Sequence, residues 1–360
     1  MADAPNPSGT PQQELEEALG LVRRDLSKLE VNLRVADHTV TTECDKLTLR
    51  LHYPAFRQGK PMVSELIDAV SMHVIHFCLP RKDVAAVYDL YGSVEVEEFT
   101  QRVETLRQEA YDLFKRAHLA TNRNGEAGEL ILYLLTEWLL GAPQIIAKMS
   151  LKTNTEMPVH GADGIHARYC SETGRLFVYW GEAKLYQDVG MAIAEAAKSI
   201  VESLKDEKLK HEIGLVRRYL DLSGLSEAGK KAMLAMLDPF GKGYPDRHDV
   251  ISCLIAFDFD AFAAALAAED PEEEFCKLAR TKLAEVGPKI ATALKGKGIA
   301  HQPVEMFIVP VPSVERLRDL FQDKIGWKKP LMTRAKKKMP IKKKTPVKRK
   351  PAGGSKGGAA

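Results

Sequence analysis

The sequence predicts an α/β (α+β) protein in which helices flank a central mixed sheet. Short segments of alternating apolar and polar residues indicate strands with one buried face. Between them lie segments with apolar residues every three or four positions, a spacing typical of amphipathic helices. Apolar residues make up 45% of the chain and charged residues 28%, a composition that suits a buried core and a hydrated surface.

The first 120 residues are predicted to combine helices and strands. Residues 1–12 are rich in Pro, Gly and Ser, and we expect this N-terminus to be disordered. Residues 13–120 then form an N-terminal α+β region. Its predicted helices are Glu14–Lys28, Val63–Phe77, Lys82–Tyr91 and Val96–Leu119, and its predicted strands are Val31–Val35 and Leu47–Tyr53.

The central block predicts a helix, three strands and a second helix, in that order. The first helix covers Gly125–Leu140, with Asn124 as its N-cap and Gly141-Ala142-Pro143 at its end. The second helix covers Val189–Leu204. The three strands are Ile145–Lys152, Met157–Tyr169 and Arg175–Lys184, and Ser171–Gly174 forms the turn between the last two.

Residues 121–327 are assigned to one core with a helical insertion. Beyond the central block, the core is predicted to contain the helices Glu207–Leu222, Glu227–Leu237, Asp270–Val286 and Ser313–Ile325 and the strands Val250–Asp258 and Val304–Val309. Residues 328–360 form a basic tail, which we expect to be disordered because its prolines and its like charges oppose packing.

Charge is divided sharply between the body and the tail. Of 52 Lys and Arg residues, 13 lie from Lys328 onward, where there is no Asp or Glu. The first 327 residues therefore carry 39 basic and 49 acidic side chains, a net charge of −10. Such a tail favours contact with nucleic-acid phosphates without sequence preference. The predicted contact residues are Lys336, Lys337, Lys338, Lys342, Lys343, Lys344, Lys348, Arg349 and Lys350.

Cysteine and hydropathy patterns predict a cytoplasmic protein. The five cysteines are widely separated and form no Cys-x-x-Cys pair, so we expect reduced thiols and neither a disulfide framework nor a zinc site. No apolar run is long enough to cross a membrane, and residues 1–13 lack the pattern of an export signal.

One group of charged residues suggests a catalytic site. Glu182 and Lys184 end a predicted strand, and residues two apart on a strand share a face. Asp163 lies on the preceding predicted strand, where hairpin pairing can bring it beside them. Glu129 lies in the first turns of the preceding helix. On spacing alone, a solvated strand end with a surface ion pair is an equally good interpretation.

Phosphodiester cleavage requires these residue types. Clustered carboxylates form a hard oxygen site for Mg²⁺, with Mn²⁺ as an alternative. The ion polarises the phosphate and lowers the pKa of a bound water. A neighbouring lysine can orient that water or stabilise the charge that develops on phosphorus. We therefore predict a metal site formed by Asp163, Glu182 and the carbonyl of Ala183.

The amino-acid sequence of the central block resembles that of a known family. The stretches that carry the resemblance are Asn124–Leu130, Lys148–Asn154, Met157–His166 and Gly181–Tyr186. They are similar to HamA, the nuclease subunit of the bacterial Hachiman anti-phage system, and to the Asp…Glu-x-Lys pattern of the PD-(D/E)xK nucleases. Residue 162 is Ala where that pattern has Pro. The resemblance is clearest over residues 121–204 and excludes the tail.

The resemblance implies a restriction-endonuclease-like core with N- and C-terminal helical elaborations. It also implies metal-dependent DNA cleavage by Asp163, Glu182 and Lys184, with Glu129 as a fourth member, under the control of a superfamily-2 helicase partner like HamB. The chain has no Gly-x-x-x-x-Gly-Lys-Ser/Thr loop, so an ATP-driven step belongs to another protein.

Two questions stay open at this point. Glu126 competes with Glu129 for the acidic position on the helix, and the helix dipole favours either carboxylate. The alternative function is a non-catalytic nucleic-acid-binding or scaffolding subunit that acts through its basic tail.

Overall fold

A computed structural model describes residues 10–37, 44, 46–121, 125–152, 161–220 and 227–327. The basic tail and its nine predicted contact residues lie outside this part of the chain. Helix α1 (Pro11–Leu21) begins inside the segment predicted to be disordered, because Thr10 and Gln13 form a capping box at its start.

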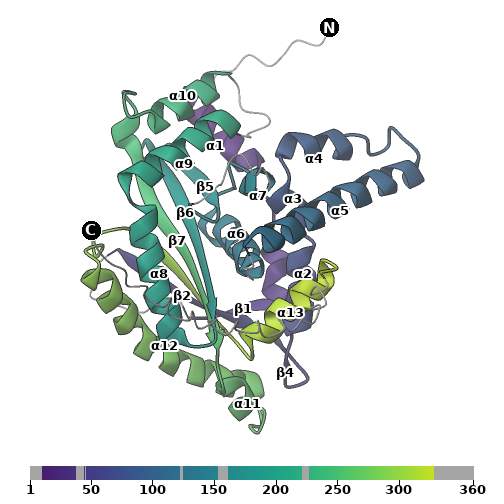
Figure 1. The fold of residues 1–360 in the computed structure, drawn as a ribbon, viewed down its shortest axis with the longest axis vertical. Helices are drawn as coiled ribbons and strands as arrows, with labels where there is room; N and C mark the ends of the chain where they lie inside the picture. Colours follow the sequence, from purple (N-terminus) through teal and green to yellow (C-terminus); the bar gives the residue numbers. More distant parts are fainter. Residues whose placement is uncertain are drawn as a thin grey trace, which may run out of the picture. The chain divides into compact units, whose positions relative to one another are not determined.

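The core of the protein is a mixed sheet of six strands in the order β1–β2–β8–β7–β6–β5 (Figure 1). Strands β2, β8, β7 and β6 run parallel, and β1 and β5 pair antiparallel at the two edges. The predicted fold class is therefore confirmed. The strands are β1 (Leu33–Asp37), β2 (Leu47–Pro54), β5 (Ile165–Cys170), β6 (Arg175–Tyr186), β7 (Arg247–Asp258) and β8 (Val304–Val311), and a separate small hairpin joins β3 (Phe56–Arg57) to β4 (Lys60–Pro61).

Helices cover both faces of this sheet and fix which way each strand residue points. One face packs against α8 (Val189–Ser203) and α12 (Pro271–Gly296), and the other packs against α6 (Glu126–Leu140), as Figure 1 shows. The side of α6 also holds α2 (Val63–Ser71), α3 (Val74–Cys78), α4 (Arg81–Tyr88), α5 (Val96–Thr121) and α13 (Val314–Lys324). The remaining helices are α7 (Lys148–Lys152), α9 (Asp206–Tyr219), α10 (Glu227–Leu237) and α11 (Ala261–Ala265), with 3-10 turns at Ser27–Val31 and Tyr244–Asp246.

Most of the predicted elements are present with small changes at their ends. Helices α6, α8, α10 and α13 and strands β6, β7 and β8 match their predicted ranges closely. The N-cap of α6 is Gly125, and Asn124 lies outside the described residues. Helix α12 continues ten residues past the predicted end at Val286, with Pro288 accommodated inside it.

The prediction of a strand over Ile145–Lys152 is wrong. Within this range Ile145 N–H donates to Ile165 O (3.0 Å), and the preceding Gln144 forms an isolated bridge with His166. The chain then forms the short helix α7. Its residues, Lys-Met-Ser-Leu-Lys, are mostly good helix formers, which explains why the extended pairing stops.

The predicted strand Met157–Tyr169 is also shorter than expected. Residues 153–160 lie outside the described chain, and β5 begins only at Ile165. Asp163 therefore precedes the strand. Asp163 N–H donates to Gly181 O (2.7 Å) while Gly181 N–H donates to Gly164 O (2.8 Å). Two residues thus face one, which is the arrangement of a β-bulge and re-aims the side chain at that point.

Two predicted helices are interrupted, both near Arg24. The helix expected over Glu14–Lys28 ends at Leu21, and the following extended chain lets Arg24 reach the buried carboxylate of Glu137 (2.8 Å). The helix expected over Val63–Phe77 breaks after Ser71 into α2 and α3. At this break His73 Nδ1 lies 3.4 Å from the Arg24 guanidinium, so the half-buried Arg24 lies at both interruptions.

Candidate active site

Glu182 and Lys184 form an ion pair near the end of β6. Their side chains point to the face of the sheet that α8 covers, because they continue the alternation of Val178 and Trp180, which are buried on that face. Lys184 Nζ donates to Glu182 Oε1, and the two side chains are only 18% and 12% exposed. This confirms that the two residues emerge together from the strand.

Asp163 joins this pair through the bulge before β5. Its carboxylate accepts a hydrogen bond from the main-chain N–H of Ala183 (2.9 Å), the residue between Glu182 and Lys184. Its own N–H is bonded to Gly181 O. The structure therefore brings Asp163, Glu182 and Lys184 together at one point of the sheet, although Asp163 reaches it from an irregular segment.

The charges at this point are incompletely balanced. Burial, and secondly the negative charge of Asp163, raise the pKa of Glu182 to about 7, and the Lys184 ammonium and a hydrogen bond from Ser199 of α8 oppose this rise. Burial alone would lower the pKa of Lys184, but the attraction of Glu182 outweighs it and raises that pKa. Two carboxylates thus share one cation in a largely dry environment, an arrangement that a further cation would stabilise.

The residue next to Glu182 on the neighbouring strand is uncharged. Cys253 lies opposite Glu182 in the parallel register of β6 and β7. Its thiol is fully buried, and this burial, followed by the charge of Glu182, raises its pKa. Cys253 therefore contributes no charge and lies below the charged groups.

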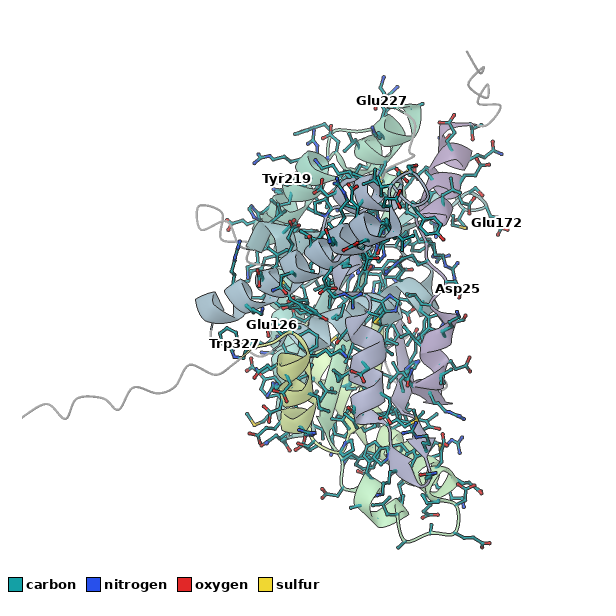
Figure 2. The ribbon with its side chains drawn as sticks, turned by 90° about the vertical axis from the view of Figure 1, so that its right-hand side faces the viewer. Asp25, Glu126, Glu172, Tyr219, Glu227 and Trp327 are labelled. Carbon is teal, nitrogen blue, oxygen red and sulfur yellow. The ribbon has the colours of Figure 1, made fainter. Side chains whose placement is uncertain are left out.

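Glu129 lies on a helix that packs on the other face of β6. The neighbouring Gly128 contacts Ala183 and Leu185, the residues that alternate with Glu182 and Lys184 along the strand. Glu126 and Glu129 are both half-buried in the first turn of α6, and Figure 2 marks Glu126 at that end. The role of Glu129 as a fourth catalytic residue stays a prediction, and so does the choice between it and Glu126.

Several histidines and one lysine lie on or near the elements that form this site. His166 is buried, and its Nδ1 is bonded to the carbonyl of Ala142 (2.9 Å). His73 lies at the N-terminal end of α3 and His76 lies within that helix, and both are half-buried. His160 lies outside the described residues. Lys152 lies in α7 and not at the end of a strand.

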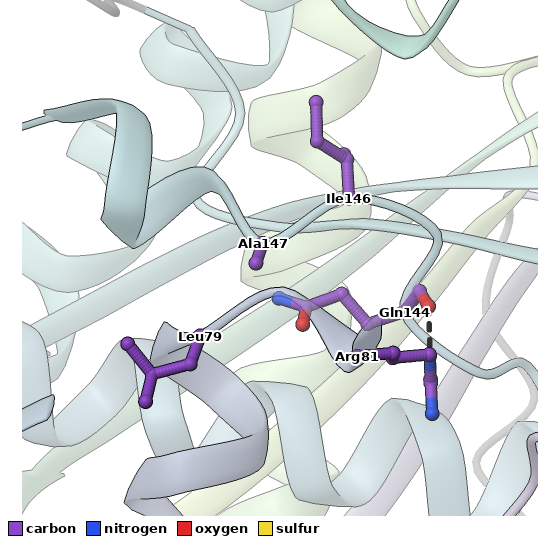
Figure 3. Close-up of a pocket in the computed structure, with 5 residues that line it drawn as sticks. All are labelled: Leu79, Arg81, Gln144, Ile146 and Ala147. Atoms are coloured by element: carbon purple, nitrogen blue, oxygen red, sulfur yellow. Dashed lines mark hydrogen bonds between the residues drawn. The ribbon is translucent and has the colours of Figure 1, made fainter. Parts of the chain in front are cut away.

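Two pockets lie away from the charged group. One, lined by Leu79, Arg81, Gln144, Ile146 and Ala147, has no room for a ligand, and in it Arg81 donates to the Gln144 carbonyl (3.0 Å; Figure 3). The other, of about 330 Å³, lies between α4, α5 and Ser150 of α7. Neither contains Asp163, Glu182 or Lys184.

Comparison with known proteins identifies the family. The HamA family model matches residues 30–325, which is most of the chain. The chain belongs to the HamA family. No curated protein matches it. The family resemblance of the central block is thereby confirmed, and family membership is consistent with a role in Hachiman defence.

Within this HamA chain, two charged residues near the site have no part in the sequence-based prediction. Lys148 of α7 and Glu212 of α9 form an ion pair at 2.9 Å, and both side chains are almost completely buried. The sequence places Lys148 on a strand that does not form. Glu212 shares the apolar face of α9 with Leu209, Ile213 and Val216, and an acidic residue on such a face is the signal that could have revealed it.

Among the described residues of this family member, no group of three His, Cys, Asp or Glu side chains could hold a metal ion by itself. The metal site predicted from Asp163, Glu182 and the Ala183 carbonyl contains two carboxylates and a main-chain oxygen, and it stays a prediction. No helix in the described chain is long and apolar enough to cross a membrane.

Proposed function

We propose that this HamA protein is a metal-dependent DNA nuclease, the effector of an anti-phage defence system, and that a partner helicase controls it. The observation that carries the proposal is the convergence of Asp163, Glu182 and Lys184 around the main chain of Ala183. Two carboxylates and one lysine near a strand end suit metal-dependent hydrolysis of a phosphodiester, because they can bind the ion and stabilise the charge that develops.

The residues fit Mg²⁺ or Mn²⁺. Both ions prefer oxygen ligands, and the carboxylates of Asp163 and Glu182 supply them. Ala183 can supply a third oxygen. Its N–H faces Asp163, and the N–H and C=O of one strand residue point to the same side, so its carbonyl also faces Asp163. Burial, followed by the negative charge of Asp163, raises the pKa of Glu182 to about 7, and a bound cation would favour its ionised form. When bound, the ion polarises the phosphate and lowers the pKa of a coordinated water.

Each residue of the proposed site then has a separate role. The Ala183 N–H holds the Asp163 carboxylate in place. Lys184 is held beside Glu182, and its ammonium donates to the attacking water or to the phosphate oxygens, where negative charge grows in the transition state. The burial of this pair excludes bulk water and strengthens these interactions.

The charge of the protein and the lack of an ATP-binding motif support the proposed control by a helicase. The first 327 residues have a net charge of −10, which opposes unaided binding to DNA. The sequence contains no phosphate-binding loop for ATP. A partner that hydrolyses ATP and delivers DNA supplies both functions. The tail then adds a sequence-independent attraction to the phosphates.

Cleavage assays with purified components test this proposal. Linear and supercoiled DNA are incubated with the protein, with and without the helicase that accompanies it, in Mg²⁺ or EDTA. We expect cutting only with the metal ion and strongly increased by the helicase. Glu182→Gln, a nearly isosteric change, should abolish cutting while the variant still binds the helicase. Cutting by this variant at the wild-type rate would overturn the assignment.

The rival function gives a different pattern. A scaffolding subunit would bind DNA without cutting it under any of these conditions, and removal of residues 328–360 would eliminate its binding entirely. Cutting at full rate by the protein alone would retain the nuclease but exclude control by a helicase.

A further inference from the structure

The buried ion pair between Lys148 and Glu212 is connected to Asp163 through the carbonyl of Ala162, the preceding residue. Lys148 Nζ lies 2.9 Å from both carboxylate oxygens of Glu212, and it also donates to the main-chain carbonyl of Ala162. The side chains of Lys148 and Glu212 are 1% and 3% exposed. The pair thus links α7, α9 and the segment that immediately precedes the candidate metal ligand.

These contacts fix one peptide plane. The carbonyl of Ala162 and the N–H of Asp163 belong to the same peptide unit, which is planar and rigid. Its carbonyl is bonded to Lys148, and its N–H is bonded to Gly181 O (2.7 Å). Because both ends of the plane are held, the direction of the Asp163 N–Cα bond is fixed, and the bond from Gly181 N–H to Gly164 O (2.8 Å) limits rotation about it.

The segment needs this support because the strand does not provide it. Asp163 lies two residues before β5, and it is bonded to the sheet through its main-chain N–H and its carboxylate, outside the regular strand pairing. Gly161 approaches Glu212 so closely that a Cβ at this position would lie 1.7 Å from Oε1, and its φ of +150° suits glycine. The chain therefore passes directly over the Glu212 carboxylate on its way to Asp163.

A contribution to the stability of the fold is a weak explanation for the buried ion pair between Lys148 and Glu212. Removing two charges from water is costly, and replacing a buried ion pair with apolar residues of similar volume is often neutral or stabilising. A role in holding the segment that contains Asp163 in one geometry would explain the pair better. Groups that orient metal ligands typically affect metal affinity or activity about 10–100-fold when they are removed.

We propose that Lys148 and Glu212 are positioning residues that hold the Ala162–Asp163 peptide so that the Asp163 carboxylate faces the metal site. This inference rests on the proposed function, because it assigns a role toward the same ion. Neither residue touches the substrate, and both act through the Asp163 main chain.

The test uses the full-length variant Lys148→Met/Glu212→Met, which replaces the pair by apolar side chains of similar length. Mn²⁺ is titrated into the metal-free protein, and free Mn²⁺ is measured by electron paramagnetic resonance. We expect affinity about tenfold or more weaker than that of the wild type. Hydrogen exchange in peptides covering residues 161–164 and 182–184 should become clearly faster, while exchange in β7 and β8 stays unchanged.

A matched control removes another ion pair of the same sheet. Arg50 of β2 and Glu305 of β8 are paired at 3.0 Å, away from β5 and β6. Arg50→Met/Glu305→Met should leave Mn²⁺ affinity and exchange around residue 163 unchanged. If Lys148→Met/Glu212→Met does not fold, Glu212→Gln replaces it, because this change keeps the shape of the side chain and removes only the charge that holds Lys148.

The possible outcomes separate the two proposals. Wild-type Mn²⁺ binding that Glu182→Gln abolishes, together with weaker binding and faster local exchange in the folded pair variant, supports the positioning role. Unchanged affinity and exchange in that variant would overturn the positioning role and leave the nuclease proposal intact. A wild-type protein that neither binds Mn²⁺ nor cuts DNA would overturn both.

Discussion

The Asp163 carboxylate accepts a hydrogen bond of 2.9 Å from the main-chain N–H of Ala183. Through this bond, one side chain bridges from the bulge before β5 to the residue that separates Glu182 from Lys184. Asp163 thus has an observed role as a hydrogen-bond acceptor and a proposed role in metal binding that depends on its charge. These roles can be separated by substitution.

Asp163→Asn should lose activity and keep stability, whereas Asp163→Ala should lose both. Asn retains an oxygen that can accept the Ala183 N–H, so its free energy of unfolding in EDTA should stay close to that of the wild type. Ala leaves this N–H unpaired, at a cost of about 1–3 kcal/mol. DNA cleavage should fall about 100-fold or more in both variants, since even groups that only support a metal ligand affect activity about 10–100-fold. Urea unfolding and a cleavage assay check this, and equal destabilisation of the two variants would contradict it.

Lys184→Met should abolish cleavage while metal binding persists. The lysine is proposed to act on the water and the phosphate, and both carboxylates remain in the variant. Mn²⁺ affinity should therefore stay near the wild-type value or increase, because a competing cation has been removed. Lys198→Met on the exposed face of α8 is the control and should change neither quantity. Loss of Mn²⁺ binding in Lys184→Met would show that the lysine mainly maintains the structure of the site.

The stability of the protein should fall as the pH decreases from about 6.5 to about 4, partly because of His166. Burial lowers the pKa of His166 to about 4, against an ordinary value of 6.5. Below pH 6.5 the unfolded chain takes up a proton on this residue that the folded protein does not, so acid favours unfolding. At pH 5 this difference amounts to about 2 kcal/mol.

Comparison of two histidine variants isolates this effect. His166→Gln should lose less of its free energy of unfolding between pH 7 and pH 5 than the wild type, by about 2 kcal/mol. His211 is exposed on α9, and His211→Gln should lose as much as the wild type. Chemical unfolding at the two pH values measures both, and parallel losses in all three proteins would refute the assignment.

Removal of residues 328–360 should weaken DNA binding and reduce its dependence on salt. For each phosphate that the tail neutralises, its removal should make the plot of log affinity against log salt less steep by about 0.9. Metal-dependent cutting should persist when the helicase delivers the DNA, because Asp163, Glu182 and Lys184 all precede the tail. Affinity measured at several salt concentrations checks the first part, and complete loss of cutting in the presence of helicase would contradict the second.

The sequence predicts best those features that depend on periodicity. Glu182 and Lys184 share a face because they lie two apart on a regular strand, and their spacing predicts this correctly. The helices that flank β5 and β6 have clear apolar stripes, and the sequence locates them as well.

Features that depend on distant contacts were not predictable. The bulge at Asp163 and Gly164 breaks the alternation of the strand and has no periodic signal. The partners Lys148 and Glu212 are 64 residues apart in the sequence, and only the packing of α9 brings them together. The helix α7 stands where a strand is predicted, because local preference for helix prevails after a short pairing with β5.

The position of β8 has a consequence for the synthesis of this protein. Among the described strands β8 is the last to be made, yet it lies between β2 and β7 and is the direct link between the two halves of the sheet. Until it emerges from the ribosome, β2 and β7 each have an unpaired edge. Asp163, Glu182 and Lys184 are therefore translated before the sheet that supports them is complete. The proposed nuclease can reach its final fold only after nearly all of residues 1–327 have been translated.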